Sequence, residues 1–245
     1  MSERKVAVEP ADLARQWPLP AKEQVHQELK RALEGCRRKM VVLDDDPTGV
    51  QTVHGLYVYT DWERETLLQG LRSEQPMFFV LTNSRGFTAE ETERAHQEIG
   101  KNLAWAAREA GQPFVLISRG DSTLRGHYPL ETETLRQTLE RELETCYDGE
   151  IIMPYFQEGR LTIGDVHYVK MGEQLVPAGM TEFAKDTTFA YTSSDLKDWC
   201  QERTGGRYRA EEMVSISLEE LRALDYPGIT RKLMGVSGFQ KVVVN

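Results

Sequence analysis

Three adjacent carboxylates mark the first part of the sequence that could do chemistry. Asp44, Asp45 and Asp46 directly follow a short apolar run and lead into a Pro-Thr-Gly turn. Neighbouring carboxylates repel one another, so we expect a cation or another partner beside them. Asp45 and Asp46, together with the more distant Asp121, can accept hydrogen bonds from the hydroxyl groups of a ligand. A solvated, turn-forming loop is the alternative interpretation of the triple aspartate.

Arginines occur in comparable positions, each shortly after an apolar run. They are Arg85, Arg119, Arg125 and Arg160. A guanidinium group can hold a carboxylate or phosphate through two parallel hydrogen bonds. Ser122 and Thr123 add hydroxyl and backbone donors at a turn before a predicted helix, which is typical of anion sites. Any one of these arginines could form a surface ion pair, but arginines and aspartates together predict a site for a small polyhydroxy acid.

The apolar runs that precede these clusters predict the strands of an α/β fold. They are short and rich in β-branched or aromatic residues, and they cover 40–43, 56–59, 77–81, 114–117, 151–153, 213–216 and 241–244. Helical patterns lie between many of them, which predicts a mostly parallel, Rossmann-like sheet flanked by helices. Residues 159–186 interrupt this alternation and predict a β-hairpin excursion, with a turn at Gly164 and Asp165.

The helices are predicted with different strength. The pattern over 88–110 is the clearest, because Thr88 and Glu91 form a capping-box signature and Gly111 supplies a stop. Further patterns cover 129–147, 194–202 and 218–224. Residues 1–39 are expected to form an N-terminal extension with one amphipathic helix over 21–35, whose apolar stripe is Val25, Leu29 and Leu33. Residues 40–245 are expected to form a single α/β domain.

Polar clusters follow several of the predicted strands. They cover 44–49, 82–86, 118–127 and 154–160. In open α/β sheets, ligands bind beyond the carboxyl ends of the strands. We therefore expect all four clusters to meet at one edge of one sheet and to form a binding site there.

Composition and charge narrow the class of protein. The chain of 245 residues carries a net charge of -9, which disfavours a nucleic-acid partner. Its three cysteines, Cys36, Cys146 and Cys200, are far apart and are expected to be reduced thiols. The polar N-terminal segment is not expected to be a signal peptide, and no apolar run approaches the ~20 residues of a membrane span. We expect a cytoplasmic protein with no membrane partner.

The histidines give a weaker signal. His26 and His96 fall on helical patterns and are expected at the surface, whereas His54, His127 and His167 lie in or near the polar clusters. None of them shows the spacing of metal ligands. No metal site is predicted.

The first cluster resembles the motif of haloacid dehalogenase-type phosphatases. That family has an apolar strand followed by Asp-x-Asp-x-Thr, which here would make Asp44 the nucleophile and Asp46 the acid/base. The family also needs a later lysine and an acidic pair that binds magnesium, and these do not follow at the expected distances. A phosphatase is therefore the weaker of two family resemblances.

The stronger resemblance is to the four-carbon acid sugar kinase family, formerly a domain of unknown function. Asp-Asp-Pro-Thr-Gly at 45–49, Ser-Arg at 84–85 and Asp-Ser-Thr-Leu-Arg-Gly at 121–126 match its motifs in the same order, and the resemblance covers about 40–245. Arg119 stands where many members have lysine. The resemblance implies substrate contacts from Asp45, Asp46, Arg85, Arg119, Asp121, Ser122, Thr123, Arg125, Gly126 and Arg160. It also implies an aspartate as general base, with Asp121 preferred over Asp45.

In that family an N-terminal domain binds the acid sugar and a separate C-terminal domain binds ATP. This chain is similar only to the first. The resemblance therefore implies the substrate-binding half of an ATP-dependent kinase for a sugar acid such as a tetronate. ATP and Mg²⁺ would be bound mainly by the C-terminal nucleotide-binding domain, and the isolated chain is expected to be inactive. A non-catalytic sugar-acid-binding module stays open, as do self-association and the identity of the acid.

Overall fold

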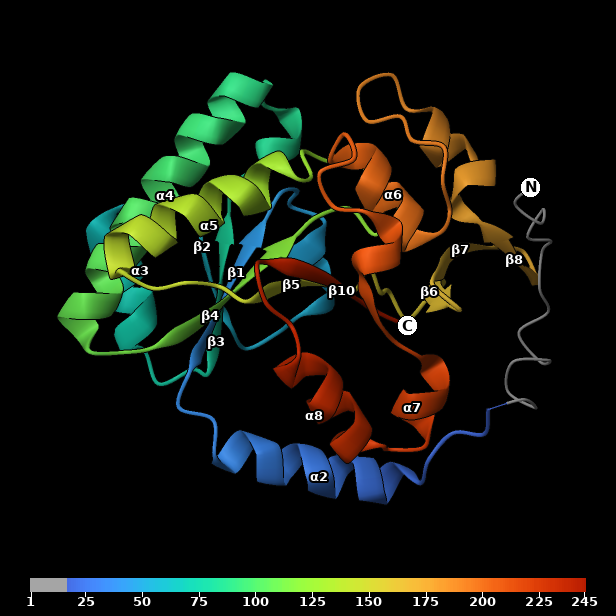
Figure 1. Cartoon of the computed structure of the whole chain (residues 1–245). Helices are drawn as coiled ribbons and strands as arrows, with labels where there is room; N and C mark the ends of the chain where they lie inside the picture. Colours follow the sequence, from blue (N-terminus) through green and yellow to red (C-terminus); the bar gives the residue numbers. More distant parts are fainter. Residues whose placement is uncertain (1–16) are drawn as a thin grey trace. The chain divides into compact units, whose positions relative to one another are not determined.

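The computed structural model describes residues 17–245 and divides them between two compact units (Figure 1). Unit 2 comprises residues 33–121 and 126–146, and unit 1 comprises the remainder, including the short segment 122–125. Residues 1–16 of the predicted extension lie outside the described residues.

Unit 2 contains a four-stranded parallel sheet in the order β2-β3-β1-β4. Its strands are β1 (Lys39–Asp44), β2 (Tyr57–Tyr59), β3 (Met77–Leu81) and β4 (Phe114–Arg119), and its helices are α3 (Arg64–Arg72), α4 (Ala89–Ala110) and α5 (Leu130–Leu143). Two 3-10 turns, η1 (Gly49–Thr52) and η2 (Ser84–Gly86), follow β1 and β3. The parallel strands with connecting helices confirm the predicted α/β class.

The core of unit 2 lies between one face of this sheet and its helices. Alternate strand residues supply the sheet side, and leucine, isoleucine and alanine supply the helix side: Val41, Leu43, Phe78 and Val80 against Leu67, Leu71, Ile99, Leu103, Ala106 and Leu135. The capping box at the start of α4 is formed, since Thr88 accepts from the backbone N–H of Glu91, and Gly111 ends the helix with φ of 59°. The sheet and the helices of unit 2 thus share one apolar core.

Unit 1 contains two smaller sheets. A parallel sheet has the order β5-β10-β9, and an antiparallel one has the order β6-β7-β8. The strands are β5 (Gly149–Ile152), β6 (Arg160–Ile163), β7 (Val166–Met171), β8 (Gln174–Pro177), β9 (Val214–Ile216) and β10 (Gln240–Val244). The turn at Gly164 and Asp165 joins β6 to β7, which confirms the predicted hairpin excursion, and β8 extends it by one strand.

The helices of unit 1 are short, apart from the one near the N-terminus. They are α2 (Lys22–Glu34), α6 (Leu196–Arg203), α7 (Leu218–Arg222) and α8 (Tyr226–Met234), with 3-10 turns η3 (Ala178–Met180), η4 (Glu182–Lys185) and η5 (Ala210–Glu212). The predicted amphipathic helix is present as α2, whose last two residues belong to unit 2. Its stripe of Val25, Leu29 and Leu33 is exposed rather than buried.

One topological expectation is wrong. We expected all four polar clusters at one edge of one sheet, but the strand before the fourth cluster, β5, pairs with β10 in a different sheet. Of the four strands that precede the polar clusters, β1, β3 and β4 lie in the sheet of unit 2 and β5 does not. Sequence order alone does not state which sheet a strand joins.

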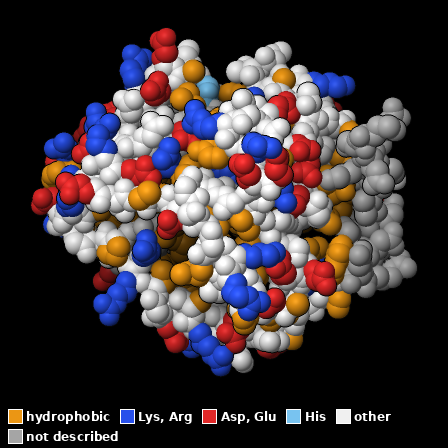
Figure 2. All heavy atoms as spheres, viewed as in Figure 1, with side chains coloured by type: hydrophobic (Ala, Val, Ile, Leu, Met, Phe, Trp, Pro, Cys, Tyr) orange, Lys and Arg blue, Asp and Glu red, His pale blue; other side chains and the backbone are white. Residues whose placement is uncertain are grey.

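The surface carries charged side chains of both signs (Figure 2). On the face drawn in Figure 2, acidic and basic side chains are interspersed rather than separated into patches of one sign. No helix within residues 17–245 is long and apolar enough to span a membrane. Cys36 and Cys146 are exposed free thiols, and Cys200 is a buried one.

Candidate functional site

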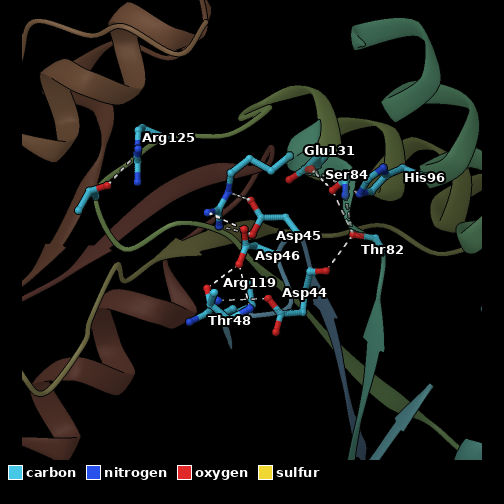
Figure 3. Close-up of polar contacts among 12 residues, drawn as sticks. Asp44, Asp45, Asp46, Thr48, Thr82, Ser84, His96, Arg119, Arg125 and Glu131 are labelled. Carbon is cyan, nitrogen blue, oxygen red and sulfur yellow. Dashed lines mark hydrogen bonds and ion pairs between the residues drawn. The ribbon is translucent and has the colours of Figure 1, made fainter. Parts of the chain in front are cut away.

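The carboxyl edge of the parallel sheet in unit 2 brings three of the predicted clusters together. Asp44, the last residue of β1, pairs in register with Leu81 of β3 and with Arg119 of β4. The residues that follow these strand ends therefore start side by side. Figure 3 shows the resulting group of acidic, basic and hydroxyl side chains.

Arg85 grips two of the three aspartates. Its Nε and Nη2 atoms donate to the two carboxylate oxygens of Asp45 at 3.0 and 2.6 Å, and its Nη1 atom donates to Asp46 at 3.3 Å. Asp45 is only 4% exposed. The partner that the triple aspartate needs is thus a guanidinium group held in a two-point contact.

Burial dominates the electrostatics of Asp45. Desolvation raises its pKa to about 6, against the contact with Arg85, and the charges of Glu131 and Asp44 add to the rise. For Arg85, burial opposes the charge, but the hydrogen bond and charge of Asp45, helped by Asp121 and Asp46, raise the pKa overall. Arg85 therefore stays charged, while Asp45 changes its protonation state close to neutral pH.

Asp46 lies in the opposite environment. The hydroxyl and the backbone N–H of Thr48 both donate to its Oδ1 atom, and these bonds lower the pKa of Asp46. Two adjacent carboxyl groups thus have shifts of opposite sign, the pattern that separates acid and base roles at a site. Asp46 remains ionised across the range in which Asp45 titrates.

Asp44 pairs with the second arginine of the edge. Its Oδ1 accepts from Nη1 of Arg119 at 3.1 Å, its Oδ2 has no hydrogen-bond partner within residues 17–245, and burial raises its pKa. A Cβ at Gly49 would lie 2.2 Å from both Asp44 Oδ2 and Arg119 Nη1, so a larger residue there would force this ion pair to shift. Asp44 is 0% exposed. A phosphate ester could not reach it, which argues against the phosphatase hypothesis.

Two more predicted residues lie near Asp45. The charge of Asp121 raises the pKa of Arg85, and Gly126 has φ of 138°. A Cβ at Gly126 would lie 3.5 Å from Asp45 Oδ2, so the backbone passes close to that carboxylate. In unit 2 the structure therefore groups Asp45, Asp46, Arg85, Arg119, Asp121 and Gly126.

The other predicted residues belong to unit 1, where buried side chains fix the segment 122–125. Nε2 of His167 donates to the carbonyl of Ser122 at 2.8 Å, and the hydroxyl of Tyr191 donates to the carbonyl of Thr123 at 2.8 Å. Leu124 adopts a φ of 69°, which is unfavourable for a bulky residue and requires support from its surroundings. Hydrogen bonds from buried side chains therefore hold the backbone of segment 122–125 in this conformation.

Arg125 and Arg160 lie over one aromatic ring. Their guanidinium carbons are 5.1 and 5.7 Å from the ring centroid of Phe183. Arg125 also donates to Thr123 Oγ1 at 3.1 Å and lies 3.8 Å from Asp186. An aromatic face orients a guanidinium group without using up its hydrogen-bond donors. This pair is suited to an anionic group.

Several residues of this neighbourhood were missed or misjudged from the sequence. His96 was expected at the surface but is 1% exposed, next to Glu131. Glu131 has the position of an ordinary acidic residue in a first helical turn, and Tyr191 lies in a loop far along the chain. Only the Thr-Glu-Phe-Ala-Lys-Asp segment at 181–186 offered a signal, which is how Phe183 could have been found.

The described residues offer no evident metal centre. No group of three or more histidine, cysteine, aspartate or glutamate side chains within 17–245 could hold a metal ion. Arg85 and Arg119 balance the carboxylates instead. The chemistry that this arrangement offers is therefore hydrogen bonding to hydroxyl groups in unit 2 and anion binding by arginines in unit 1.

Comparison with solved structures shows the fold. A putative tRNA synthase from Salmonella typhimurium LT2 is 17% identical with a TM-score of 0.59, covering 84% of this chain and 48% of that one. A DUF1537 protein from Bordetella bronchiseptica, a domain-swapped dimer with bound citrate, is 21% identical with a TM-score of 0.57, covering 85% and 48%. A Haemophilus influenzae protein of the same family is 14% identical with a TM-score of 0.56, covering 84% and 47%.

The chain spans about half the length of these structures. No curated protein matches its sequence. The family model described as a sugar-binding N-terminal domain matches residues 40–244, which is most of the chain. The chain therefore belongs to the family of sugar-binding N-terminal domains, in agreement with its resemblance to the acid sugar kinases.

Proposed function

We propose that this chain is the substrate-binding half of an ATP-dependent kinase that phosphorylates a four-carbon sugar acid. The observation that carries the proposal is the buried Asp45 carboxylate, held in two-point contact by Arg85 at the carboxyl edge of a parallel sheet. This is where open α/β sheets bind their ligands. A carboxylate fixed in this way accepts hydrogen bonds from ligand hydroxyl groups with little reorganisation.

The ligand class follows from the two kinds of side chain. Asp45 and Asp46 suit hydroxyl groups, and Arg125 and Arg160 suit an acid group. The citrate in the Bordetella bronchiseptica structure is a small hydroxy acid bound to a protein of similar fold. A tetronate, with one carboxylate and several hydroxyl groups, belongs to this ligand class.

The kinase part of the proposal concerns the other half of the enzyme. The solved structures of similar fold are about twice as long as this chain. We assign ATP and Mg²⁺ to a C-terminal nucleotide-binding domain of such an enzyme, acting in the cytoplasm. Asp121 is the candidate base for the reacting hydroxyl group, because its charge already acts on Arg85 within the group around Asp45.

A thermal-shift experiment tests the ligand class. Erythronate and threonate should raise the melting temperature without ATP, since ligand at a hundredfold excess over its dissociation constant stabilises the native state by about 2.7 kcal/mol. Erythritol, which lacks the acid, and succinate, which lacks the hydroxyl groups, are the matched controls and should have little effect. If succinate raised the melting temperature as much as threonate does, the aspartates would not bind the ligand hydroxyl groups. If no sugar acid raised the melting temperature, the ligand class would be refuted.

A further inference from the structure

A buried polar network adjoins the Asp45–Arg85 pair, and the proposed function makes no use of it. Its members are at most 6% exposed: Thr82, Ser84, His96 and Glu131. They come from the residues after β3 and from α4 and α5, so three separate elements of unit 2 converge on them (Figure 3). Polar groups buried this deeply are costly unless they are fully partnered, which suggests that they have a role.

Glu131 is held by a hydroxyl group from the site edge. Ser84 Oγ donates to Glu131 Oε1 at 2.7 Å, and Thr82 Oγ1 lies 3.0 Å from Ser84 Oγ. Thr82 also donates from its backbone N–H to the carbonyl of Asp44 at 2.9 Å. Hydrogen bonds thus link the Glu131 carboxylate to the end of β1, one residue before Asp45.

His96 also approaches the Glu131 carboxylate. Its Nδ1 atom lies 2.7 Å from the carbonyl oxygen of Thr92. Because a carbonyl oxygen only accepts, Nδ1 carries the hydrogen, and Nε2 is the ring nitrogen that faces Glu131 Oε1 at 3.8 Å. The imidazole ring therefore lies against the Glu131 carboxylate from within α4.

The charged groups around Asp45 come from every element at this edge. They are Arg85 from η2, Asp44 and Asp46 from the end of β1, Glu131 from α5, and Asp121, which acts on Arg85. Arg119 neutralises Asp44. Among these groups Glu131 lies in a helix, and its side chain contacts Ser84 and His96. Its negative charge disfavours the ionised form of Asp45.

We propose that Glu131 is a positioning residue: held by Ser84 and His96 in the buried network beside the Asp45–Arg85 pair, its carboxylate is a fixed negative charge that acts on Asp45, the acceptor for ligand hydroxyl groups. The inference rests on the proposed function only in assigning Asp45 to the ligand. The electrostatic coupling itself belongs to the protein without ligand. It can therefore be tested separately from the ligand assignment.

The test is a carboxyl ¹³C NMR titration of the full chain without ligand, with Asp45 assigned through the Asp45→Asn variant. Glu131→Gln should lower the midpoint of Asp45 by about half a pH unit or more, the scale on which like charges shift buried carboxyl groups. Glu131→Met should give the same shift, because both replacements remove the charge, whereas a purely structural role would make them differ. The control Glu133→Gln, at a buried carboxylate of α5 that pairs with Arg136, should leave Asp45 unchanged.

The outcomes separate the two proposals. An unchanged Asp45 midpoint in both Glu131 variants overturns the positioning role. Should Glu131→Met fail to fold, Glu131→Gln decides alone, because glutamine keeps the size of the side chain and an oxygen that can accept from Ser84, and an unchanged Asp45 midpoint in it overturns the role. Threonate affinity in wild type should fall below pH about 6, and in Glu131→Gln only at lower pH. An NMR shift without threonate binding at any pH supports the coupling and refutes the ligand.

Discussion

Asp45 and Asp46 are neighbours in the chain, yet the structure treats their charges in opposite ways. Burial raises the pKa of Asp45 from 3.8 to about 6, whereas bonds from Thr48 lower that of Asp46. Between pH 3.8 and about 6 the native state keeps a proton on Asp45 that the unfolded state has lost. The contribution of Asp45 to stability therefore falls as pH rises through this window, by about 3 kcal/mol in total.

Asp45→Asn should remove this dependence. We expect its melting temperature at pH 7 to equal or exceed that of wild type, because the buried charge is gone and Arg85 keeps Asp46. Sugar-acid binding should be lost at the same time. Asp46→Asn is the matched control with the opposite sign, since removing a favoured carboxylate lowers stability at neutral pH. Melting curves from pH 4 to 8 measure both, and a destabilised Asp45→Asn with an unchanged pH profile would contradict the assignment.

Arg125 gives a second prediction at the scale of a residue. Arg125→Ala should weaken sugar-acid binding by about 10- to 150-fold, because it removes a charge-assisted contact worth about 1.5–3 kcal/mol. Its contacts include the Thr123 hydroxyl, the ring face of Phe183 and Asp186 at 3.8 Å, and none of these lies in a hydrophobic core, so we expect the fold to survive. Calorimetry measures the affinity. Arg108→Ala, at an exposed position of α4, should change it little, and equal losses from both would mean that segment 122–125 is not part of a site.

At the scale of elements, the contact between α4 and α5 holds His96 and Glu131 in place. The helices touch at Gly100, where an added Cβ would lie 2.8 Å from Thr138 Cγ2. Gly100→Ala should therefore destabilise the protein by about 1–3 kcal/mol through overpacking, in spite of a helix-propensity gain near 1 kcal/mol. Adding Thr138→Ala removes the methyl group at 2.8 Å but leaves Thr138 Cβ at 3.0 Å, so it should restore part of the lost stability. Urea denaturation measures both variants, and a Gly100→Ala protein as stable as wild type would show that the helices can separate there without cost.

Periodicity predicted most of these elements. The apolar runs at 40–43, 77–81 and 114–117 became β1, β3 and β4, and the capping box and Gly111 fixed α4. Their parallel register then placed Asp45, Arg85 and Arg119 together, as expected for polar residues after parallel strands. The helix α3, the helix α8 and the strand β8 were missed, because short elements carry too few periods to stand out.

The parts that the sequence could not predict depend on tertiary contacts. β5 has the composition of any buried strand, and only its pairing with β10 excludes it from the sheet of unit 2. His96 and Glu131 sit at helical positions that suit exposed polar residues equally well. Their role depends on Ser84, which lies 47 residues before Glu131. Long-range hydrogen bonds of this kind leave no local pattern.

For the whole molecule, the family motif is divided between two units. Asp121 and Gly126 belong to unit 2, whereas the four residues between them belong to unit 1. Side chains of unit 1, His167 and Tyr191, hold the backbone of that segment. A single stretch of sequence, 121–126, therefore contributes to two separately packed units, and each unit must fold to shape its share of the motif.

The proposed split of the kinase gives the last prediction. With ATP, Mg²⁺ and a sugar acid, this chain alone should show negligible phosphorylation. A domain that seats only the acceptor forfeits the proximity of donor and acceptor, which is worth up to about 7–11 kcal/mol of the barrier. Adding the nucleotide-binding half, fused or as a separate chain, should produce activity in a coupled ADP-release assay.

In that restored enzyme, Asp121→Asn should lower turnover about 10²- to 10⁴-fold, the usual contribution of a general base, while substrate affinity changes much less. Asp121 has this role only if it takes the proton of the reacting hydroxyl group; as a binding residue it would change affinity and turnover together. Comparing kcat with the calorimetric affinity separates the two cases. Robust phosphorylation by the isolated chain would refute the split, whereas sugar-acid binding without activity even in the presence of the second half would favour a non-catalytic binding module.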